Sequence, residues 1–357
     1  MRRLLLFSRH AVCLLLASLL LCGLLSACGQ SQGQAKLPER SEAQTESETQ
    51  DPNKLPYADV MEQAAELHSK AAGLIREERL SRGIPLSEDD KLGIGLLGEE
   101  FTAIMTTSAG LPEKRTSQLP DFAALCVHLF NQAGLKAGDA VGANFSGSYP
   151  GLNLAVLCAA EVMGLDLRYT TSVGSSAYGA NVPQYTFPEM VKTVCDAGLI
   201  SRMPILVTLG GGGDMGRNYI GYVIEDPDDI ALIEEMIDRL KANGLVPAEI
   251  ESYTQDISLH EELYGDIRLF VNVGGNGLGL GGSEDSYMLK AGNGLLQPRE
   301  IQITGRSGLT ERYLAKGIPA VHLLAVGQLC EDNGIPFDPD EIPAPGTSDV
   351  YFRREKP

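Results

Sequence analysis

The sequence has 357 residues and a formal net charge of −18 at pH 7, because 47 Asp and Glu outnumber 29 Lys and Arg. Such an acidic composition argues against a nucleic-acid partner, since proteins that bind nucleic acids neutralise phosphates with clustered basic side chains. Residues 57–357 are enough for one large α/β domain, or for two lobes, with a substantial core.

The N-terminus has the features of an export signal. Arg2, Arg3 and Arg9 precede an apolar run at residues 11–25, which is short for a membrane span and typical of a signal peptide. The sequence LSAC at residues 25–28 resembles the bacterial lipobox, which implies cleavage after residue 27 and acylation of Cys28. An ordinary signal peptide or an uncleaved N-terminal anchor is the alternative. Each interpretation puts the rest of the chain outside the cytoplasm.

Residues 28–56 are predicted to form a disordered tether between the membrane and a folded domain. The segment is rich in Gln, Ser, Glu and Pro and has few apolar side chains to bury. If the signal peptide is removed, three arginines leave with it and no acidic residue does, so the net charge changes from −18 to −21.

Helices and strands alternate along the rest of the chain. Apolar residues at helical spacing predict helices at residues 57–83, 119–135, 151–165, 187–199, 226–244 and 307–317. Short apolar runs predict strands at residues 137–145, 166–173, 203–209, 266–273 and 318–326. From residue 337 the chain is rich in proline and is expected to be irregular.

This alternation predicts an α/β fold. Repeated strand–helix–strand units form a mostly parallel sheet with helices on both faces, in a doubly wound, Rossmann-like arrangement of three layers. The predicted strands lack a clean polar–apolar alternation, as expected for strands buried on both faces.

Cysteine and histidine residues indicate no disulfide or metal site. Cys126, Cys158, Cys195 and Cys330 lie in apolar helical contexts without a CxxC pair, so buried thiols are expected. His128 and His322 lie in apolar runs and are predicted to be buried or half-buried. His68 and His260 are predicted to lie on helix surfaces.

Loops rich in Gly and Ser follow four of the predicted strands and predict one binding site. In an open parallel sheet the ligand crevice lies beyond the carboxyl ends of the strands. The alternative is that these glycines only allow tight strand–helix turns, and Ser148 would then be a helix cap before Pro150. The candidate ligand-binding residues in these loops are Ser146, Gly147, Ser148, Ser175, Ser176, Asn181, Gly211, Gly212, Asp214, Arg217, Asn272, Gly274, Gly275 and Asn276.

Residues 106–117 add hydroxyl groups and two cations ahead of a predicted helix. The combination of hydroxyls, backbone N–H groups and a guanidinium suits a carboxylate or a phosphate. A solvated surface loop is the alternative, and Asp214 and Arg217 would pair with each other if they do not meet a ligand. The candidates in this segment are Thr106, Thr107, Lys114, Arg115 and Thr116.

Familiar cofactor motifs are absent from the sequence. GxGxxG occurs at residues 93–98 and 277–282, but neither copy lies between a clear strand and an immediate helix. No Walker A, HExxH or GxSxG motif is present. We therefore expect neither a cofactor nor a metal, and ATP-dependent chemistry is also unexpected outside the cell.

Seven segments occur in an order that resembles the bacterial poly-γ-glutamate system proteins. These segments are TTSAGLPEKRT, DFAAL, FSGSYPGLNLAVLCAAEVMGL, TSVGSSAYGAN, LGGGGDMGR, FVNVGGN and GIPAVHLL, and the resemblance covers residues 57–352. It implies an exported, membrane-anchored accessory protein of poly-γ-glutamate synthesis and export. The family has no assigned catalytic residues, so none is transferred to this sequence. A plain N-terminal anchor is common in the family, whereas this chain has LSAC.

Three hypotheses follow for function. The preferred one is an envelope lipoprotein that binds γ-glutamyl chain ends, or a membrane component of the synthase and export machinery. The second is a γ-glutamyl amide hydrolase or transferase using a hydroxyl of Ser146, Ser148, Ser175 or Thr107, for which the sequence shows no base. The third is a scaffold. The net charge opposes binding of an anionic γ-glutamyl polymer except in a locally positive crevice.

Overall fold

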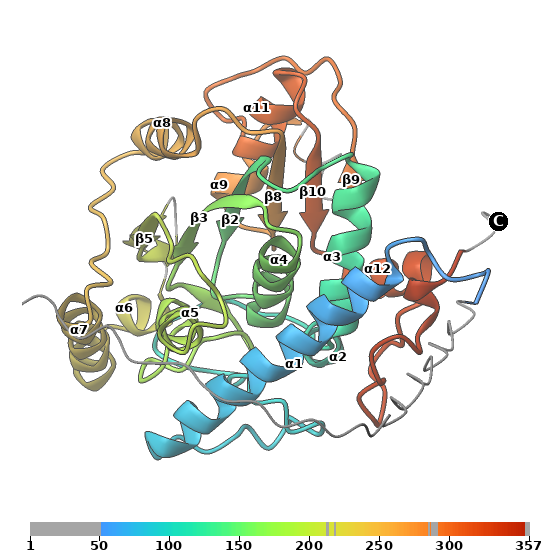
Figure 1. Ribbon diagram of the computed structural model, residues 1–357. Coiled ribbons are helices and arrows are strands. Elements are labelled where there is room, and N and C mark those ends of the chain that lie inside the picture. Colours follow the sequence, from blue (N-terminus) through green and yellow to red (C-terminus); the bar gives the residue numbers. More distant parts are fainter. Residues whose placement is uncertain (1–50, 212–213, 218, 285, 287–291, 354–357) are drawn as a thin grey trace, which may run out of the picture. The chain divides into compact units, whose positions relative to one another are not determined.

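A six-stranded sheet forms the centre of the fold, in the order β5-β3-β2-β8-β10-β9 (Figure 1). Its parallel strands are β2 (Ala140–Phe145), β3 (Asp166–Ser172), β5 (Leu206–Thr208), β8 (Leu269–Val273) and β10 (Ala320–Leu323), and β9 (Gly294–Leu296) runs antiparallel to β10 at one edge. All five predicted strands are present, and the predicted α/β class with a mostly parallel sheet is confirmed.

The computed structural model describes residues 51–353, except 212–213, 218, 285 and 287–291. The predicted signal peptide, most of the predicted tether and Gly212 lie outside the described residues, as do the side chains of Met215 and Arg217. The described residues belong to one compact unit, Gln50–Pro357. Within them, no helix is long and apolar enough to cross a membrane.

Helices cover both faces of the sheet. On one face α1 (Ala58–Ser81) packs against α3 (Asp121–Gln132), α4 (Pro150–Val162) and α5 (Phe187–Asp196), and this layer shares the largest hydrophobic cluster with β2, β3 and β8. On the other face lie α8 (Tyr253–Tyr264), α9 (Gly277–Leu280) and α11 (Leu309–Ala315). Near β5, α6 (Ile220–Ile224) and α7 (Pro227–Ala242) form a third cluster.

The chain winds in both directions from the middle of the sheet. From β2 it continues to β3 and then to β5 on one side, and later it returns to β8 and β10 on the other side of β2. Crossovers therefore leave the sheet in opposite senses at β2 and β8, which is the switch point where doubly wound sheets bind ligands.

Two short parallel ladders lie beyond the strand ends. β1 (Met105–Thr107) pairs with β4 (Ser175–Ser176), and β6 (Gly210–Gly211) pairs with β7 (Met215–Arg217). The helix α2 (Leu111–Thr116) follows β1 after three residues, and α12 (Val326–Asn333) follows β10. These elements connect loops that the sequence analysis predicted to form one binding site.

Several expectations about single residues can be compared with the fold. Cys126, Cys158 and Cys330 are buried free thiols and Cys195 is a half-buried one, as expected. His68 was expected on a helix surface, but it is fully buried, because α1 is covered by α4 and the His68 Nε2 lies 3.1 Å from the Gly151 carbonyl oxygen.

The C-terminal segment is largely irregular, as predicted, but it packs against the core. The 3₁₀ helix η2 (Asp349–Tyr351) buries Val350 and Tyr351, and the Leu55 amide donates to the Tyr351 carbonyl at 2.9 Å. The first and the last residues of the described chain are therefore hydrogen-bonded to each other.

A buried carboxylate connects three helices at one side of the sheet. Glu189 in α5 is 2% exposed and pairs with Arg82 beyond α1 at 3.1 Å and with Arg239 of α7 at 2.9 Å. The same carboxylate accepts the Thr186 amide, which completes a capping box. Burial opposes ionisation, but the hydrogen bonds from Arg239 and Thr186 outweigh it and lower the pKa of Glu189.

Glu189→Gln is therefore expected to destabilise the fold by about 3 kcal/mol at neutral pH, because two guanidinium groups lose a buried partner. Since the pKa of Glu189 is lowered in the folded state, this contribution is present above 4.5 and is lost as the pH falls through the folded value. Urea denaturation at several pH values measures the effect.

Glu78→Gln is the matched control, since Glu78 also pairs with Arg82 but is 37% exposed. Its cost is expected to stay below about 1 kcal/mol. Equal destabilisation by both variants would show that the three-helix connection does not depend on Glu189.

Candidate functional site

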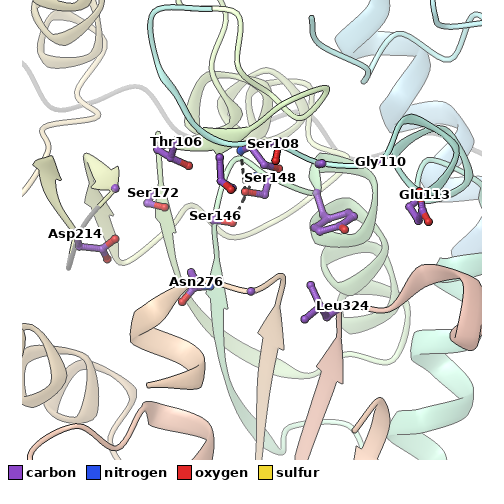
Figure 2. Close-up of a pocket in the computed structure, with 17 residues that line it drawn as sticks. Thr106, Ser108, Gly110, Glu113, Ser146, Ser148, Ser172, Asp214, Asn276 and Leu324 are labelled. Atoms are coloured by element: carbon purple, nitrogen blue, oxygen red, sulfur yellow. Dashed lines mark hydrogen bonds between the residues drawn. The ribbon is translucent and has the colours of Figure 1, made fainter. Parts of the chain in front are cut away.

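An open cleft of about 510 Å³ lies beyond the carboxyl ends of the parallel strands (Figure 2). The loops after β2, β3, β5, β8 and β10 each contribute to its wall, and residues 106–113 close it from above in the view of Figure 2. A cleft of this size accommodates a small ligand or one end of a chain.

The predicted candidates divide into residues that line the cleft and residues that do not. Those that line it are Thr106, Thr107, Ser146, Ser148, Ser176, Gly211, Asp214, Gly275 and Asn276. Lining residues that the sequence analysis did not name as candidates are Ser108, Ala109, Gly110, Glu113, Tyr149, Ser172, Gly174 and Leu324. The loops predicted to act together therefore do surround one cavity.

Other candidates hold the loops in place without lining the cleft. Asn181 is fully buried and exchanges hydrogen bonds with the backbone of Glu99, at 2.9 Å and 2.7 Å. Thr116 accepts the Asp338 amide at 2.8 Å and is also buried. The remaining candidates outside the lining are Lys114, Arg115, Gly147, Ser175, Asn272 and Gly274.

Arg115 does not supply the positive charge that the sequence analysis gave it. Its guanidinium makes a two-bond ion pair with Asp338, at 2.8 Å and 2.7 Å, and it points to the C-terminal segment. Local sequence could not indicate this partner, because Asp338 lies 223 residues away along the chain. Arg115 is therefore a structural connection between α2 and the segment around Asp338.

Polar side chains on adjacent strands form a buried layer beneath the cleft. Asn144 of β2 donates to the Asn276 side chain at 2.8 Å, and Asn272 of β8 lies 3.1 Å from Nδ1 of His322 in β10. Asn276 also caps α9 by accepting the Gly279 amide at 2.7 Å. These contacts fix the loop after β8, and they explain why His322 is buried as predicted.

Gly210 allows the loop after β5 to approach the loop after β3. Its φ is +74°, and a Cβ atom at this position would lie 2.9 Å from the Gly174 amide and 3.0 Å from Ser172 Oγ. Any larger residue would push these two cleft loops apart. At least one glycine of the run 210–213 therefore serves the close approach of two cleft loops.

Lys114 is the most unusual polar residue next to the cleft. It is 1% exposed, its Nζ donates to the Ser148 carbonyl and to Ser176 Oγ, the latter at 2.7 Å, and it lies 3.6 Å from the centre of the Tyr149 ring. Within the described residues, no carboxylate lies within ion-pair distance of this amine. Burial lowers the pKa of Lys114 well below its ordinary value.

The contacts of Lys114 suit a neutral amine as well as an ammonium. A neutral amine has two N–H groups and one lone pair, and three groups surround Nζ: the Ser148 carbonyl, the face of the Tyr149 ring and the Ser176 hydroxyl. The carbonyl can only accept a hydrogen bond and the ring face attracts an N–H. The Ser176 hydroxyl is the one group of the three that can donate to the lone pair.

Three serines lie together in front of this lysine. Ser176 Oγ contacts Lys114 Nζ, and the Ser176 amide donates to Ser148 Oγ at 3.1 Å. Ser176 lines the cleft together with Ser146 and Ser148, which Figure 2 shows side by side. One ladder sets this arrangement, since Thr107 of β1 pairs with Ser176 of β4 and α2 begins a few residues after β1. The sequence analysis found no base near the serines, and the structure puts the amine of Lys114 within hydrogen-bond distance of one serine hydroxyl.

A second cluster of ionisable groups lies beside the loop after β5. Asp214 lines the cleft, and its carboxylate lies near Asp256 and His260 of α8, with one ligand atom of each within 4.8 Å of the others. Burial, and secondly the negative charge of Asp256, raise the pKa of Asp214. His260 was predicted on a helix surface, but it is 1% exposed, because α8 packs this face against the sheet.

The cleft itself has no cationic side chain among its described lining residues, and it includes Glu113 and Asp214. Lys114 lies behind the wall, Arg115 is paired with Asp338, and the Arg217 side chain lies outside the described residues. The locally positive crevice that polymer binding would require is not provided by the described side chains of the cleft.

Comparison with known proteins yields no match: no protein-family model, no curated protein and no solved structure is significantly similar to this chain.

Lys114→Met tests whether the buried amine is neutral. Because the pKa of Lys114 is lowered in the folded state, the unfolded chain binds more protons between that value and 10.5, and wild-type stability should rise with pH across this window. The free energy of unfolding of wild type minus that of Lys114→Met is expected to increase from about pH 6 to about pH 9. Urea denaturation at several pH values measures it.

Lys136→Met, which changes an exposed lysine, is the matched control. If the difference for Lys114→Met is as independent of pH as the difference for Lys136→Met, the amine is not held in its neutral form.

Proposed function

We propose that the cleft belongs to a serine hydrolase or transferase acting on γ-glutamyl amide bonds, in which Ser176 is the nucleophile and Lys114 is its base. One observation carries the proposal: a buried lysine, without a carboxylate partner among the described residues, lies 2.7 Å from a serine hydroxyl that lines the cleft. A desolvated amine next to a hydroxyl is a recognised way to activate a weak nucleophile.

The chemistry needs only groups already described. Ser176 Oγ attacks the γ-carbonyl carbon while its proton passes to Lys114 Nζ. The C–N bond then breaks, Lys114 returns the proton to the leaving amine, and a γ-glutamyl ester remains on Ser176. Water, or the amine of another chain, resolves this ester with Lys114 again taking and returning one proton, which gives hydrolysis or transfer.

Ser148 is the best-placed group to assist this step. Its Oγ accepts the Ser176 amide at 3.1 Å, which fixes the hydroxyl beside the nucleophile. Within the described part of the chain, Ser148 Oγ donates no hydrogen bond to another residue, so its proton is available to a developing oxyanion. Ser148 is therefore expected to help without being essential.

The substrate class comes from the sequence and not from the cleft alone. The resemblance to poly-γ-glutamate system proteins, the predicted export signal and the predicted lipidation at Cys28 support an accessory protein of poly-γ-glutamate synthesis and export at the cell envelope. Membrane components of that machinery and the anionic γ-glutamyl polymer are the partners that this role implies.

Binding of a chain end is the first step of the proposed reaction, but binding alone is less well supported as the function. It was expected to rely on cations such as Arg115, whose guanidinium is occupied by Asp338. A purely structural scaffold would give no reason to bury Lys114 against a serine that lines a cleft. The catalytic proposal accounts for both observations.

Ser176→Ala is expected to lower kcat for hydrolysis of short γ-glutamyl oligomers, or of γ-glutamyl p-nitroanilide, by at least about 1000-fold, since it removes the nucleophile. Ser148→Ala should cost about 100-fold, as loss of one oxyanion donor does. Released amine and oligomer length measure turnover, and intact mass spectrometry detects the ester on Ser176.

The control is Ser81→Ala, at the exposed end of α1, which should retain wild-type turnover. Undiminished turnover by Ser176→Ala, or a folded wild type that cleaves neither the oligomers nor the anilide, would overturn the proposed reaction.

The charge of the cleft predicts which end of a chain binds. Glu113 lines the cleft and forms no ion pair with another described residue, so it favours the ammonium at the amino end of a γ-glutamyl chain. Acetylation of that amino group is expected to weaken binding of a short oligomer about threefold, as loss of one exposed charge pair would. Isothermal titration calorimetry with Ser176→Ala measures this without turnover.

In Glu113→Gln the free and acetylated oligomers should bind nearly equally, whereas the exposed control Glu249→Gln should behave like its parent. Tighter binding of the acetylated oligomer by the parent would contradict recognition of the amino end.

A further inference from the structure

Asp214, Asp256 and His260 come from two segments that are distant in the sequence. Asp214 follows β6 in the loop beyond β5, whereas Asp256 and His260 are one turn apart in α8. Their ligand atoms lie within 4.8 Å of one another, which is the spacing of groups that share one ion. Among the described residues, these three form the one such group of three His, Cys, Asp or Glu side chains.

Two members of the cluster are buried, and each has one polar atom without a partner. Asp256 is 0% exposed and His260 is 1% exposed. Within the described residues, Oδ2 of Asp256 and Nε2 of His260 have no hydrogen-bond partner, whereas Oδ1 of Asp256 contacts Nδ1 of His260. Polar atoms removed from water without a partner cost several kcal/mol, so they are rare unless something else satisfies them.

The contacts of His260 leave one ring nitrogen available to a metal. Nδ1 of His260 lies 2.9 Å from the Asp256 carbonyl oxygen, which can only accept, so Nδ1 carries the proton. In the neutral ring, Nε2 then offers a lone pair. Metal-binding histidines usually donate their other N–H to a carbonyl or carboxylate in this way, which fixes the ring.

Without a bound ion, the charges of Asp214, Asp256 and His260 would be less well balanced. Asp256 Oδ1 lies 3.1 Å from His260 Nδ1, so a protonated ring would neutralise one carboxylate. Asp214 would remain uncompensated, and no described lysine or arginine pairs with it. One divalent cation would neutralise both carboxylates and accept the Nε2 lone pair.

We propose that Asp214, Asp256 and His260 bind one divalent transition-metal ion at the side of the cleft. Two carboxylates and one imidazole are donors that suit Zn²⁺ or Mn²⁺ better than Ca²⁺ or Mg²⁺, which prefer oxygen ligands alone. Because Asp214 lines the cleft, the remaining coordination positions would open towards water or a bound substrate. The metal site that the sequence motifs did not predict would thus be assembled by the tertiary fold.

The test uses the folded chain stripped of metal with a chelator and titrated with Zn²⁺ and, separately, Mn²⁺. Isothermal titration calorimetry should show one ion bound per chain, and the melting temperature should rise with ion concentration. Asp214→Asn, which changes the ligand nearest the cleft, is expected to weaken binding at least about 100-fold, since loss of a supporting residue alone costs 10- to 100-fold.

Asp238→Asn, at an exposed carboxylate of α7 that is 83% exposed, is the matched control and should bind like wild type. Co²⁺ gives a second readout, since its visible absorption reports nitrogen and oxygen ligands and should be lost in His260→Ala. Absence of binding and of any melting shift with both ions would overturn the proposal. Equal binding by wild type and Asp214→Asn would also overturn it, because the ion would then lie elsewhere on the acidic surface. These outcomes do not depend on the proposed role of Ser176.

Discussion

The position of β2 at the centre of the sheet is the constraint on which the cleft depends. β2 pairs in parallel with β3 through Asn144 and Thr170, and with β8 through Asn144 and Asn272. Parallel pairing puts the carboxyl ends of these strands at one edge of the sheet, and the change of winding direction between β2 and β8 leaves their loops apart. Without that register, the serines after β2 and β3 would not face the asparagines after β8.

The same arrangement explains why a polar layer is tolerated inside the sheet. Thr170 lies 2.7 Å from the Tyr264 hydroxyl, which donates to the Ala143 carbonyl at 2.8 Å, and Asn144 is hydrogen-bonded to Asn276. Buried polar groups cost little when each has a partner, and a connected set of them favours one arrangement of the loops. Contacts beneath the cleft therefore help to fix its wall.

The sequence was sufficient for the parts of the fold that depend on local pattern. Runs such as residues 266–273 and 166–173 are apolar and short, and each is followed by glycine or serine, so strands, loops and the position of the cleft could be predicted. The features that it did not reveal come from distant contacts. Lys114 is in a polar segment with the composition of a surface loop, yet its amine is buried because β1 pairs with β4, about 70 residues away along the chain.

Helix α8 illustrates the same limit. Its sequence is polar enough to suggest an exposed helix, and a histidine four residues after an aspartate is common on helix surfaces. Asp256 and His260 are buried where α8 packs on β3 and α9, and the turn after β6 brings Asp214 to them. No local spacing encodes a ligand set that comes from two segments 42 residues apart, so a search for metal motifs could not find it.

The proposed serine–lysine pair and the proposed metal site also bear on how an acidic cleft could accept an acidic substrate. A γ-glutamyl residue carries a carboxylate, and the described lining of the cleft has no lysine or arginine to neutralise it. Arg115 and Lys114 do not solve this, because Arg115 is paired with Asp338 and the proposed mechanism requires a neutral Lys114. A divalent ion held by Asp214, Asp256 and His260 would give the cleft a positive charge without changing either residue. In that case the acidic cluster would help an acidic protein to bind an acidic substrate, because its carboxylates would be ligands of a cation and not free negative charges.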